Sequence, residues 1–345
     1  VADAQNSVGP RKRTRARRVR PLLARPEGGA VLGAVLLWLV FAALGRDNGF
    51  TSVAATAGIL EVAAQIGIVG TSVSLLMIAG HFDLSVGSMI GATGMVLALA
   101  ISEFTLPVWL AVVIALALGV AVGFVNGLIV VKTGLPSFVV TLASYFVLRG
   151  ATIVLARDMT GLTVVGGLNK LTDGDPVAAL FNFRAGDFRI SILWWAVLVA
   201  ISGYVLHRSR LGNWIYTTGD APTAARMVGV PTNRVVVTLF MYTAFCAALL
   251  ACLQVLTFNS ADALRGQQKE FEAITTAVIG GTLLRGGYGT ALGPVFGALS
   301  LAIVQLGIFY AGIDTDWYKI VLGALLLAAV AFNDNVRRLV LRTAR

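Results

Sequence analysis

The chain has 345 residues, of which 57% are hydrophobic and only 13% are charged. Soluble domains carry about 25% charged residues, so this composition excludes a soluble globular protein and indicates an integral membrane protein. The net charge of +10 is concentrated, because eight of the 27 basic residues lie within residues 11–25, directly before the first apolar run. Such a cluster is typical of a cytoplasmic segment that contacts anionic lipid, and we expect no nucleic-acid partner.

Ten apolar runs follow along the chain, and a helix needs roughly 20 apolar residues to cross a bilayer. The runs are 30–44, 60–80, 84–102, 107–131, 136–157, 188–206, 235–258, 271–284, 290–310 and 317–333. The first run is short, and the eighth is both short and interrupted by Gly280-Gly281. The sequence therefore predicts an all-α, polytopic membrane protein with about ten transmembrane helices.

The distribution of basic residues predicts the orientation. With ten crossings, 18 of the 27 fall on the side of the N-terminus and eight on the other side. The positive-inside rule then places both termini in the cytoplasm. A re-entrant eighth run would instead leave the arginines of the C-terminal tail outside. We expect a basic, disordered cytoplasmic tail at 1–29, a transmembrane domain at 30–333 with one sizeable cytoplasmic segment at 207–234, and a cytoplasmic tail at 334–345.

The joint between the second and third runs carries a charge, Asp83. An aspartate directly before a helix that begins at Leu84 can cap free N–H groups and meet the positive end of the helix dipole. The small residues that follow, Ser85, Gly87 and Ser88, would let another helix approach closely. Helix capping alone explains these residue types, and a role in a gate or a partner contact is the alternative.

The cytoplasmic segment contains signals for a short helix over 221–228. Asp220 suits the N-cap, Pro222 suits the first turn, Gly229 can take the left-handed position after the helix, and Pro231 forbids continuation. A helix of two turns isolated in a loop has little stability of its own. We therefore expect a partner to dock on it, and a mere connector is the alternative.

The glycines within 278–299 predict a broken helix rather than a phosphate loop, because they do not fit the G-x-G-x-x-G spacing. Unwound backbone of this kind can line a polar path through the membrane, although close packing also explains it. Polar residues within the spans, namely Glu61, Gln65, Asn126 and Arg149, need a partner or a water-filled cavity. Cys246 and Cys252 are expected to be buried structural thiols.

Nucleotide and catalytic sites are not predicted on this chain. None of the five lysines follows a glycine, which rules out the phosphate-binding pattern G-x-x-x-x-G-K-[ST]. No nucleophile–base pair and no set of metal-ligand residues appears. We therefore expect no catalytic residue, no metal and no cofactor here.

Four motifs in register resemble the permease subunits of ribose/xylose-type ABC sugar importers. They are FDLSVGS at 82–88, LPSFVVTL at 135–142, AARMVG at 224–229 and FEAITTAVIGGT at 271–282. The resemblance extends from about residue 50 to 333. It implies a ten-span permease of the cell membrane that works as a pair, with a cytoplasmic ABC ATPase that binds the ATP and an extracytoplasmic sugar-binding protein.

The resemblance also implies roles for individual residues. Thr223 through Gly229 corresponds to the coupling segment that docks on the ATPase, with Thr223 in place of the usual Glu, and Ser137 stands where the family often has a second proline. The residues expected in the coupling segment are Gly219, Asp220, Thr223, Ala224, Ala225, Arg226 and Gly229. Those expected to form the translocation path or its gate are Gln65, Asp83, Ser85, Ser88, Asn126, Phe138, Thr141, Glu272, Gly280 and Gly281.

The predicted function is the membrane subunit of an ATP-driven importer for a monosaccharide or a similar small polyol. An ABC permease for branched-chain amino acids is the nearest alternative. An ion-coupled secondary transporter would need no ATPase, but such proteins usually carry carboxylates in the middle of a span. Here the candidate carboxylates, Glu61 and Asp83, lie towards span ends, and a membrane enzyme is disfavoured by the lack of a catalytic constellation.

Overall fold

The computed structural model describes the backbone of residues 26–343 and the side chains of residues 28–331. The predicted tail at 1–29 therefore lies almost wholly outside the described residues, as do the side chains of the predicted tail at 334–345. Within the described part, six helices are long and apolar enough to cross a membrane. They are α3 (Val53–Ile78), α5 (Val108–Thr133), α6 (Ser137–Thr160), α9 (Ser191–Arg208), α12 (Thr232–Phe258) and α14 (Gly293–Tyr310).

The remaining apolar runs form shorter or less apolar helices. These are α2 (Pro26–Leu44), followed by the 3-10 turn η2 (Arg46–Asn48), α4 (Val86–Ser102), α13 (Lys269–Ile279) and α15 (Trp317–Thr343). At 11 residues α13 spans roughly 16 Å, about half of the hydrocarbon core. The chain is a mostly helical, polytopic membrane protein, as predicted.

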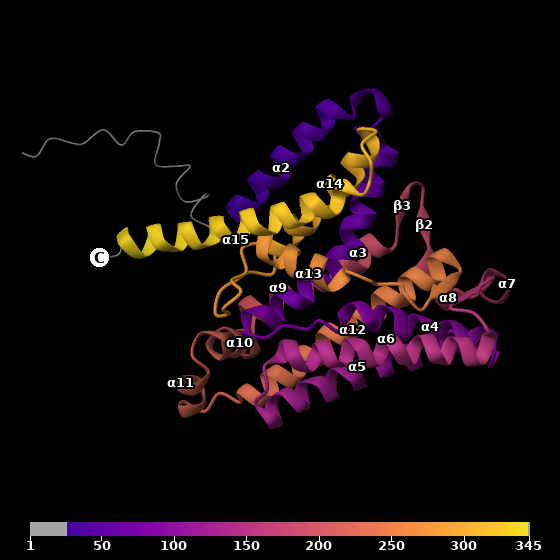
Figure 1. Cartoon of the computed structure of the whole chain (residues 1–345), viewed down its shortest axis with the longest axis horizontal. Coiled ribbons are helices and arrows are strands. Elements are labelled where there is room, and N and C mark those ends of the chain that lie inside the picture. The colour runs from indigo at the N-terminus through magenta and orange to yellow at the C-terminus, as the bar shows by residue number, and fades with distance from the viewer. Residues whose placement is uncertain (1–25, 344–345) are drawn as a thin grey trace, which may run out of the picture.

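Two small antiparallel ribbons accompany the helices. Strand β1 (Val164–Gly166) pairs with β4 (Ser260–Asp262), and β2 (Arg184–Ala185) pairs with β3 (Phe188–Arg189). Strands of two or three residues give no readable alternation in a sequence. The ribbons lie near α7 (Asn169–Thr172) and α8 (Pro176–Asn182), at the opposite end of the molecule from α10 (Arg210–Asp220) and α11 (Pro222–Met227) (Figure 1).

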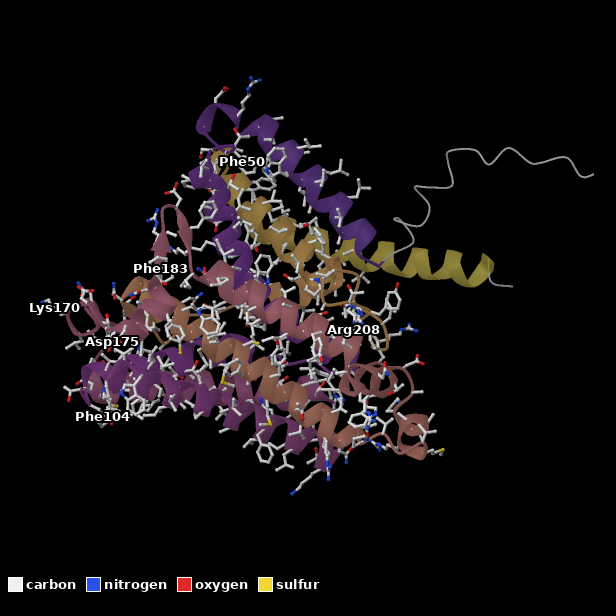
Figure 2. All side chains as sticks on the ribbon, turned by 180° about the vertical axis from the view of Figure 1, so that it is seen from behind. Phe50, Phe104, Lys170, Asp175, Phe183 and Arg208 are labelled. Atoms are coloured by element: carbon white, nitrogen blue, oxygen red, sulfur yellow. The ribbon has the colours of Figure 1, made fainter. Side chains whose placement is uncertain are left out.

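Helices α3 and α12 form the centre of the structure. Helix α12 packs against α3, α4 and α5, whereas α3 packs against α9, α13 and α14. In Figure 1, α4, α5, α6 and α12 lie together as one group, and α2, α14 and α15 lie as a second group, with α3 and α13 between them. At the tip of the second group the buried ring of Phe50 contacts Phe41 and Tyr310, with centroid distances of 6.3 and 6.0 Å (Figure 2).

Glycines allow α5 and α12 to approach closely. A Cβ atom on Gly123 would lie 2.5 Å from the Phe240 carbonyl oxygen, and one on Gly127 would lie 2.8 Å from the Val237 Cα. Small residues at helix contacts are the usual device of membrane proteins, since lipid offers no hydrophobic drive for helix association. Cys246 and Cys252 on α12 are free and buried, as predicted.

Candidate functional site

Helix α3 stops abruptly at the end of the molecule where α10 and α11 lie. Gly80, with φ of 84°, takes the left-handed conformation that terminates a helix. The Gly80 N–H donates to the Met77 carbonyl at 2.9 Å, and the His81 N–H donates to the Leu76 carbonyl at 3.1 Å. The chain then continues without helical structure until α4 begins at Val86. We call residues 79–85 the first helix break.

The first turns of α6 satisfy the backbone of this break. The Phe82 N–H donates to Ser137 Oγ at 2.9 Å, and the Leu84 N–H donates to Thr141 Oγ1 at 3.0 Å. Ser137 and Thr141 are one helical turn apart, so their hydroxyls face the same way. Non-helical backbone within a membrane protein persists only where such partners replace the lost helical hydrogen bonds.

Asp83 is buried in this break, but its role differs from the predicted one. Its Oδ1 atom accepts hydrogen bonds from the Ser85 N–H at 2.9 Å and from Ser85 Oγ at 2.6 Å. Helix α4 begins two residues later than expected, and its N-cap, Ser85, makes no side-chain capping bond. Asp83 therefore holds the turn before the helix and does not cap the first turn of α4.

A line of polar side chains connects the break to α5 and α6. Asn126 Nδ2 donates to Ser85 Oγ at 3.1 Å, and Ser144 Oγ donates to Asn126 Oδ1 at 2.5 Å. Ser88 Oγ donates to the Ser85 carbonyl at 2.8 Å. The structure thus brings together five of the residues predicted for the path or gate, all of them buried: Asp83, Ser85, Ser88, Asn126 and Thr141.

The small residues of α4 make room both for the loop after β4 and for other helices, as predicted, because Glu270 beside Gly87 belongs to α13 and a Cβ atom on Gly94 would lie 3.1 Å from Val255 on α12. A Cβ atom on Gly91 would lie 2.8 Å from the Ala263 carbonyl oxygen, and one on Gly87 would overlap the Glu270 carboxylate. The intramembrane cation Arg149 is satisfied by the same loop. Its Nη1 donates to the Ala263 carbonyl at 2.6 Å and to the Arg265 carbonyl at 3.3 Å, which supplies the partner that a charge in a span requires.

A second helix break follows α13, where the glycines predicted it. Gly281 has φ of 88°, and the Thr282 N–H donates to the Ala277 carbonyl at 2.9 Å. Residues 280–292 are then non-helical until α14 begins at Gly293. Gly280 packs on the start of α14, because a Cβ atom there would lie 2.5 Å from the Pro294 nitrogen.

The two breaks and α10 meet at a cluster that we call the glycine junction, formed by Gly80, Gly219, Gly286 and Gly287. The Gly287 N–H donates to the Ile78 carbonyl at 2.8 Å. A Cβ atom on Gly286 would lie 2.9 Å from the Gly80 Cα, and one on Gly219 would lie 2.7 Å from the Gly287 nitrogen. Three segments distant in sequence therefore touch backbone to backbone.

Two side-chain hydrogen bonds reinforce this junction. Ser74 and Thr282 share one between their hydroxyl oxygens at 2.7 Å, which links α3 to the start of the second break. Tyr216 Oη on α10 donates to the Gly289 carbonyl at 2.8 Å. A displacement of α10 would therefore reach both helix breaks directly.

The predicted short helix is present as α11, with two corrections. Asp220 is the last residue of α10 and not an N-cap, since the N-cap is Ala221 without a side-chain capping bond. The helix is also not isolated, because α10 precedes it directly. Pro222 is the first residue of α11, as the sequence indicates.

The end of α11 follows the prediction closely. Gly229 has φ of 85°, its N–H donates to the Arg226 carbonyl at 3.0 Å, and the Val230 N–H donates to the Ala225 carbonyl at 3.0 Å. This paired arrangement is the Schellman motif. Met227 and Val228 at the tip are 82% and 80% exposed, so α11 offers apolar side chains away from the rest of the chain.

Gln65 and Glu272, which were also predicted for the path, make their side-chain contacts away from the first helix break. Gln65 on α3 accepts a hydrogen bond from Gln254 Nε2 on α12 at 3.0 Å. Glu272 pairs with Lys269 at 2.5 Å in the first turn of α13. Phe138 is half-exposed on α6.

Residues 55–330 match the protein family described as the permease component of branched-chain amino acid transport systems. The chain belongs to this family. The permease is 33% identical over 293 residues to the inner membrane ABC transporter permease protein YjfF of Escherichia coli strain K12, a match that covers 84% of this chain and 86% of YjfF. No solved structure matches the chain significantly.

Two further relatives carry more specific names. The permease is 31% identical to the ribose import permease protein RbsC of Escherichia coli strain K12, over 80% of this chain and 84% of RbsC. It is 28% identical to the fructose import permease protein FrcC of Rhizobium meliloti, over 92% of this chain and 88% of FrcC. The permease is thus a transport component and not an enzyme, and it is a multi-pass protein of the plasma membrane.

Sequence reasoning missed several partners of the predicted residues. Nothing in the sequence marked Ser144 as the partner of Asn126, because serine is common in spans. Nor did anything mark Arg189 as the partner of Glu61, because Arg189 follows a loop. Thr141 was among the predicted path residues, but its contact with Leu84 and that of Ser137 with Phe82 were not predicted, and the one-turn spacing of the two hydroxyls at the start of a helix could have indicated them. Gln254 could have been found as an amide inside an apolar run.

Proposed function

We propose that the permease is the membrane-spanning subunit of an ATP-driven importer for a monosaccharide or a similar small polyol. The observation that carries this proposal is the pair of relatives named for ribose and fructose import, which match 80% and 92% of this chain. The family description names branched-chain amino acids instead. The named relatives favour the sugar, because each is matched over nearly its whole length.

The partners follow from this proposal. A cytoplasmic ABC ATPase binds the ATP and docks on α11, whose exposed apolar tip is suited to a protein contact, and the permease itself needs no cofactor. An extracytoplasmic sugar-binding protein delivers the solute to the opposite end, and a second permease copy completes the transporter. The glycine junction supports a gate that α10 moves, because it joins the coupling segment to both helix breaks.

The proposed topology has ten crossings with both termini in the cytoplasm, and the permease domain occupies 30–333. Figure 2 supports alternating crossings, since Phe104, Lys170 and Asp175 lie at one end of the molecule and Arg208 at the other. Helix α13 and the second break together count as one crossing in this arrangement. They run from the outer loop after β4 to the junction with α3 and α10.

Cysteine labelling in intact cells tests the topology. In a variant without Cys246 and Cys252, a cysteine at position 340 should resist a membrane-impermeant maleimide, because the predicted C-terminal tail is cytoplasmic. A cysteine in place of the exposed Lys170 should react within minutes. Strong labelling at position 340 without permeabilisation would rule out ten crossings.

Competition for uptake tests the solute class. Vesicles that contain the permease, its ATPase and its binding protein should take up radiolabelled D-ribose or D-fructose, and excess unlabelled leucine should leave that uptake unchanged. The expected preference for sugar over leucine is at least a hundredfold, because a binding site for hydroxyl groups leaves polar atoms unpaired when an aliphatic side chain occupies it. Leucine uptake without sugar uptake would favour the branched-chain amino acid alternative.

A further inference from the structure

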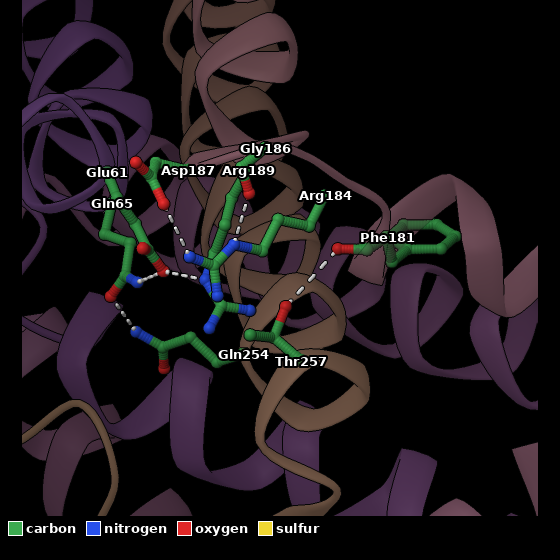
Figure 3. Close-up of polar contacts among 9 residues, drawn as sticks. All are labelled: Glu61, Gln65, Phe181, Arg184, Gly186, Asp187, Arg189, Gln254 and Thr257. Carbon is green, nitrogen blue, oxygen red and sulfur yellow. Dashed lines mark hydrogen bonds and ion pairs between the residues drawn. The ribbon is translucent and has the colours of Figure 1, made fainter. Parts of the chain in front are cut away.

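Four polar side chains from three elements form a string near the outer end of α3 and α12 (Figure 3). Arg189 Nε on β3 lies 3.0 Å from Glu61 Oε1 on α3. Gln65 Nε2, one turn further along α3, donates to the same Glu61 oxygen at 3.5 Å, and Gln254 Nε2 on α12 donates to Gln65 Oε1 at 3.0 Å. We call these residues the outer polar string.

The string leads from a partly exposed end to a buried end. The side chains of Glu61 and Arg189 are 21% and 27% exposed, whereas Gln254 is 6% exposed. Polar side chains within a span are costly and usually face a protein-lined, water-accessible route. The string therefore runs from the partly exposed ion pair of Glu61 and Arg189 to a buried amide at the contact of α3 with α12.

The string has unused hydrogen-bonding capacity at its buried end. Gln254 Oε1 has no hydrogen-bond partner within the described residues. If the side-chain amide of Gln254 were turned over, its nitrogen would lack a hydrogen-bond partner in place of its oxygen. A buried polar atom without a partner costs about 1–3 kcal/mol, so a group that supplied the missing donor would be bound favourably.

The chemistry of the string matches a neutral solute with several hydroxyl groups. Carboxylate and amide oxygens accept from hydroxyls, and amide and guanidinium nitrogens donate to them. The charges of Glu61 and Arg189 offset each other at 3.0 Å, so no net charge attracts an ionic solute. Building on the proposed transport of a monosaccharide, we propose that the outer polar string is a hydroxyl-binding station where the sugar first contacts the permease.

The test measures sugar uptake and ATP hydrolysis in vesicles that contain the permease, its ATPase and its binding protein. Gln65→Leu and Gln254→Leu keep the side-chain size but remove the hydrogen bonds. Each should lower the maximal rate of D-ribose or D-fructose uptake at least tenfold at saturating binding protein. Hydrolysis stimulated by the sugar-free binding protein should stay within twofold of wild type, because α10 and α11 are untouched.

The matched control is Arg184→Gln in the same hairpin, which breaks the exposed Arg184–Asp187 pair and leaves the string intact. It should change uptake less than twofold. Gln65→Asn, which retains the amide one methylene shorter, serves if the leucine variants do not fold, and it should change the ratio of ribose to fructose uptake at least threefold. Wild-type uptake rates and an unchanged ratio of ribose to fructose in these variants would show that the outer polar string does not bind the sugar, and would leave the proposed function intact. If the wild-type permease instead carries leucine and no sugar, both the proposed function and the role of the string are wrong.

Discussion

Replacing Gly219 by alanine is expected to abolish solute uptake. The new Cβ atom would overlap the Ile78 carbonyl oxygen and lie 2.7 Å from the Gly287 nitrogen. Both neighbours are backbone atoms, so neither can turn away as a flexible side chain would. The hydrogen bond between Gly287 and Ile78, 2.8 Å in the native junction, would be lost. Forcing one extra methyl group into a tight contact costs about 1–3 kcal/mol.

A second glycine supplies the control for this substitution. Gly203 lies in α9, and a Cβ atom there would meet only the Ala291 Cβ at 3.9 Å, which is an ordinary contact. Gly203→Ala should therefore raise the melting temperature slightly, since alanine is favoured over glycine in a helix by up to about 1 kcal/mol. Thermal unfolding in detergent and uptake in vesicles should separate the two variants, with at least a tenfold loss of uptake for Gly219→Ala. Normal uptake and stability in Gly219→Ala would show that the three backbones do not meet as described.

Gly229→Val is expected to weaken docking of the ATPase, so that stimulated ATP hydrolysis and solute uptake both fall while the protein still inserts in the membrane. The position has φ of 85° and open space around it, so the cost comes from the backbone and not from crowding. A β-branched residue held in this conformation costs about 1–3 kcal/mol. Helix α11 has six residues and little stability of its own, so this cost should displace its exposed tip.

Two measurements on membranes check this expectation. The amount of inserted Gly229→Val protein should stay near that of wild type, because the spans fold by their own packing. Hydrolysis stimulated by the binding protein and sugar uptake should fall together by at least fivefold. Gly229→Asn is the control, since asparagine tolerates the left-handed conformation, and it should retain most of the activity. An inserted valine variant with full uptake would reduce α11 to a connector.

Local patterns predicted the parts of this structure that depend on local chemistry. The apolar runs predicted the helices, Gly229 predicted the end of α11, and Gly280-Gly281 predicted the second break. These predictions succeeded because the length of an apolar run, the backbone freedom of glycine and the constraint of proline all act within a few residues. The prediction that Arg149 needs a partner was confirmed for the same reason. An unpaired charge in a span is unfavourable whatever the fold.

Contacts between distant segments could not be read from one sequence. The glycine junction joins three segments that are at least 67 positions apart (286 − 219), and the partner of Glu61 comes from a short ribbon that carries no periodic signal. Asp83 and Asp220 were expected to act as caps because aspartate often does so, but the helices begin one or two residues away from the predicted positions. A shift of one or two residues is enough to move an aspartate out of the N-cap position.

The central claim is that ATP on a separate subunit drives solute through this permease. The most direct measurement compares D-ribose and D-fructose accumulation in vesicles that hold the permease with and without its ATPase and binding protein. We expect accumulation above the external sugar concentration only when both partners and ATP are present, and none from a proton or sodium gradient. Accumulation by the purified permease alone, driven by such a gradient, would contradict the account and identify a secondary transporter.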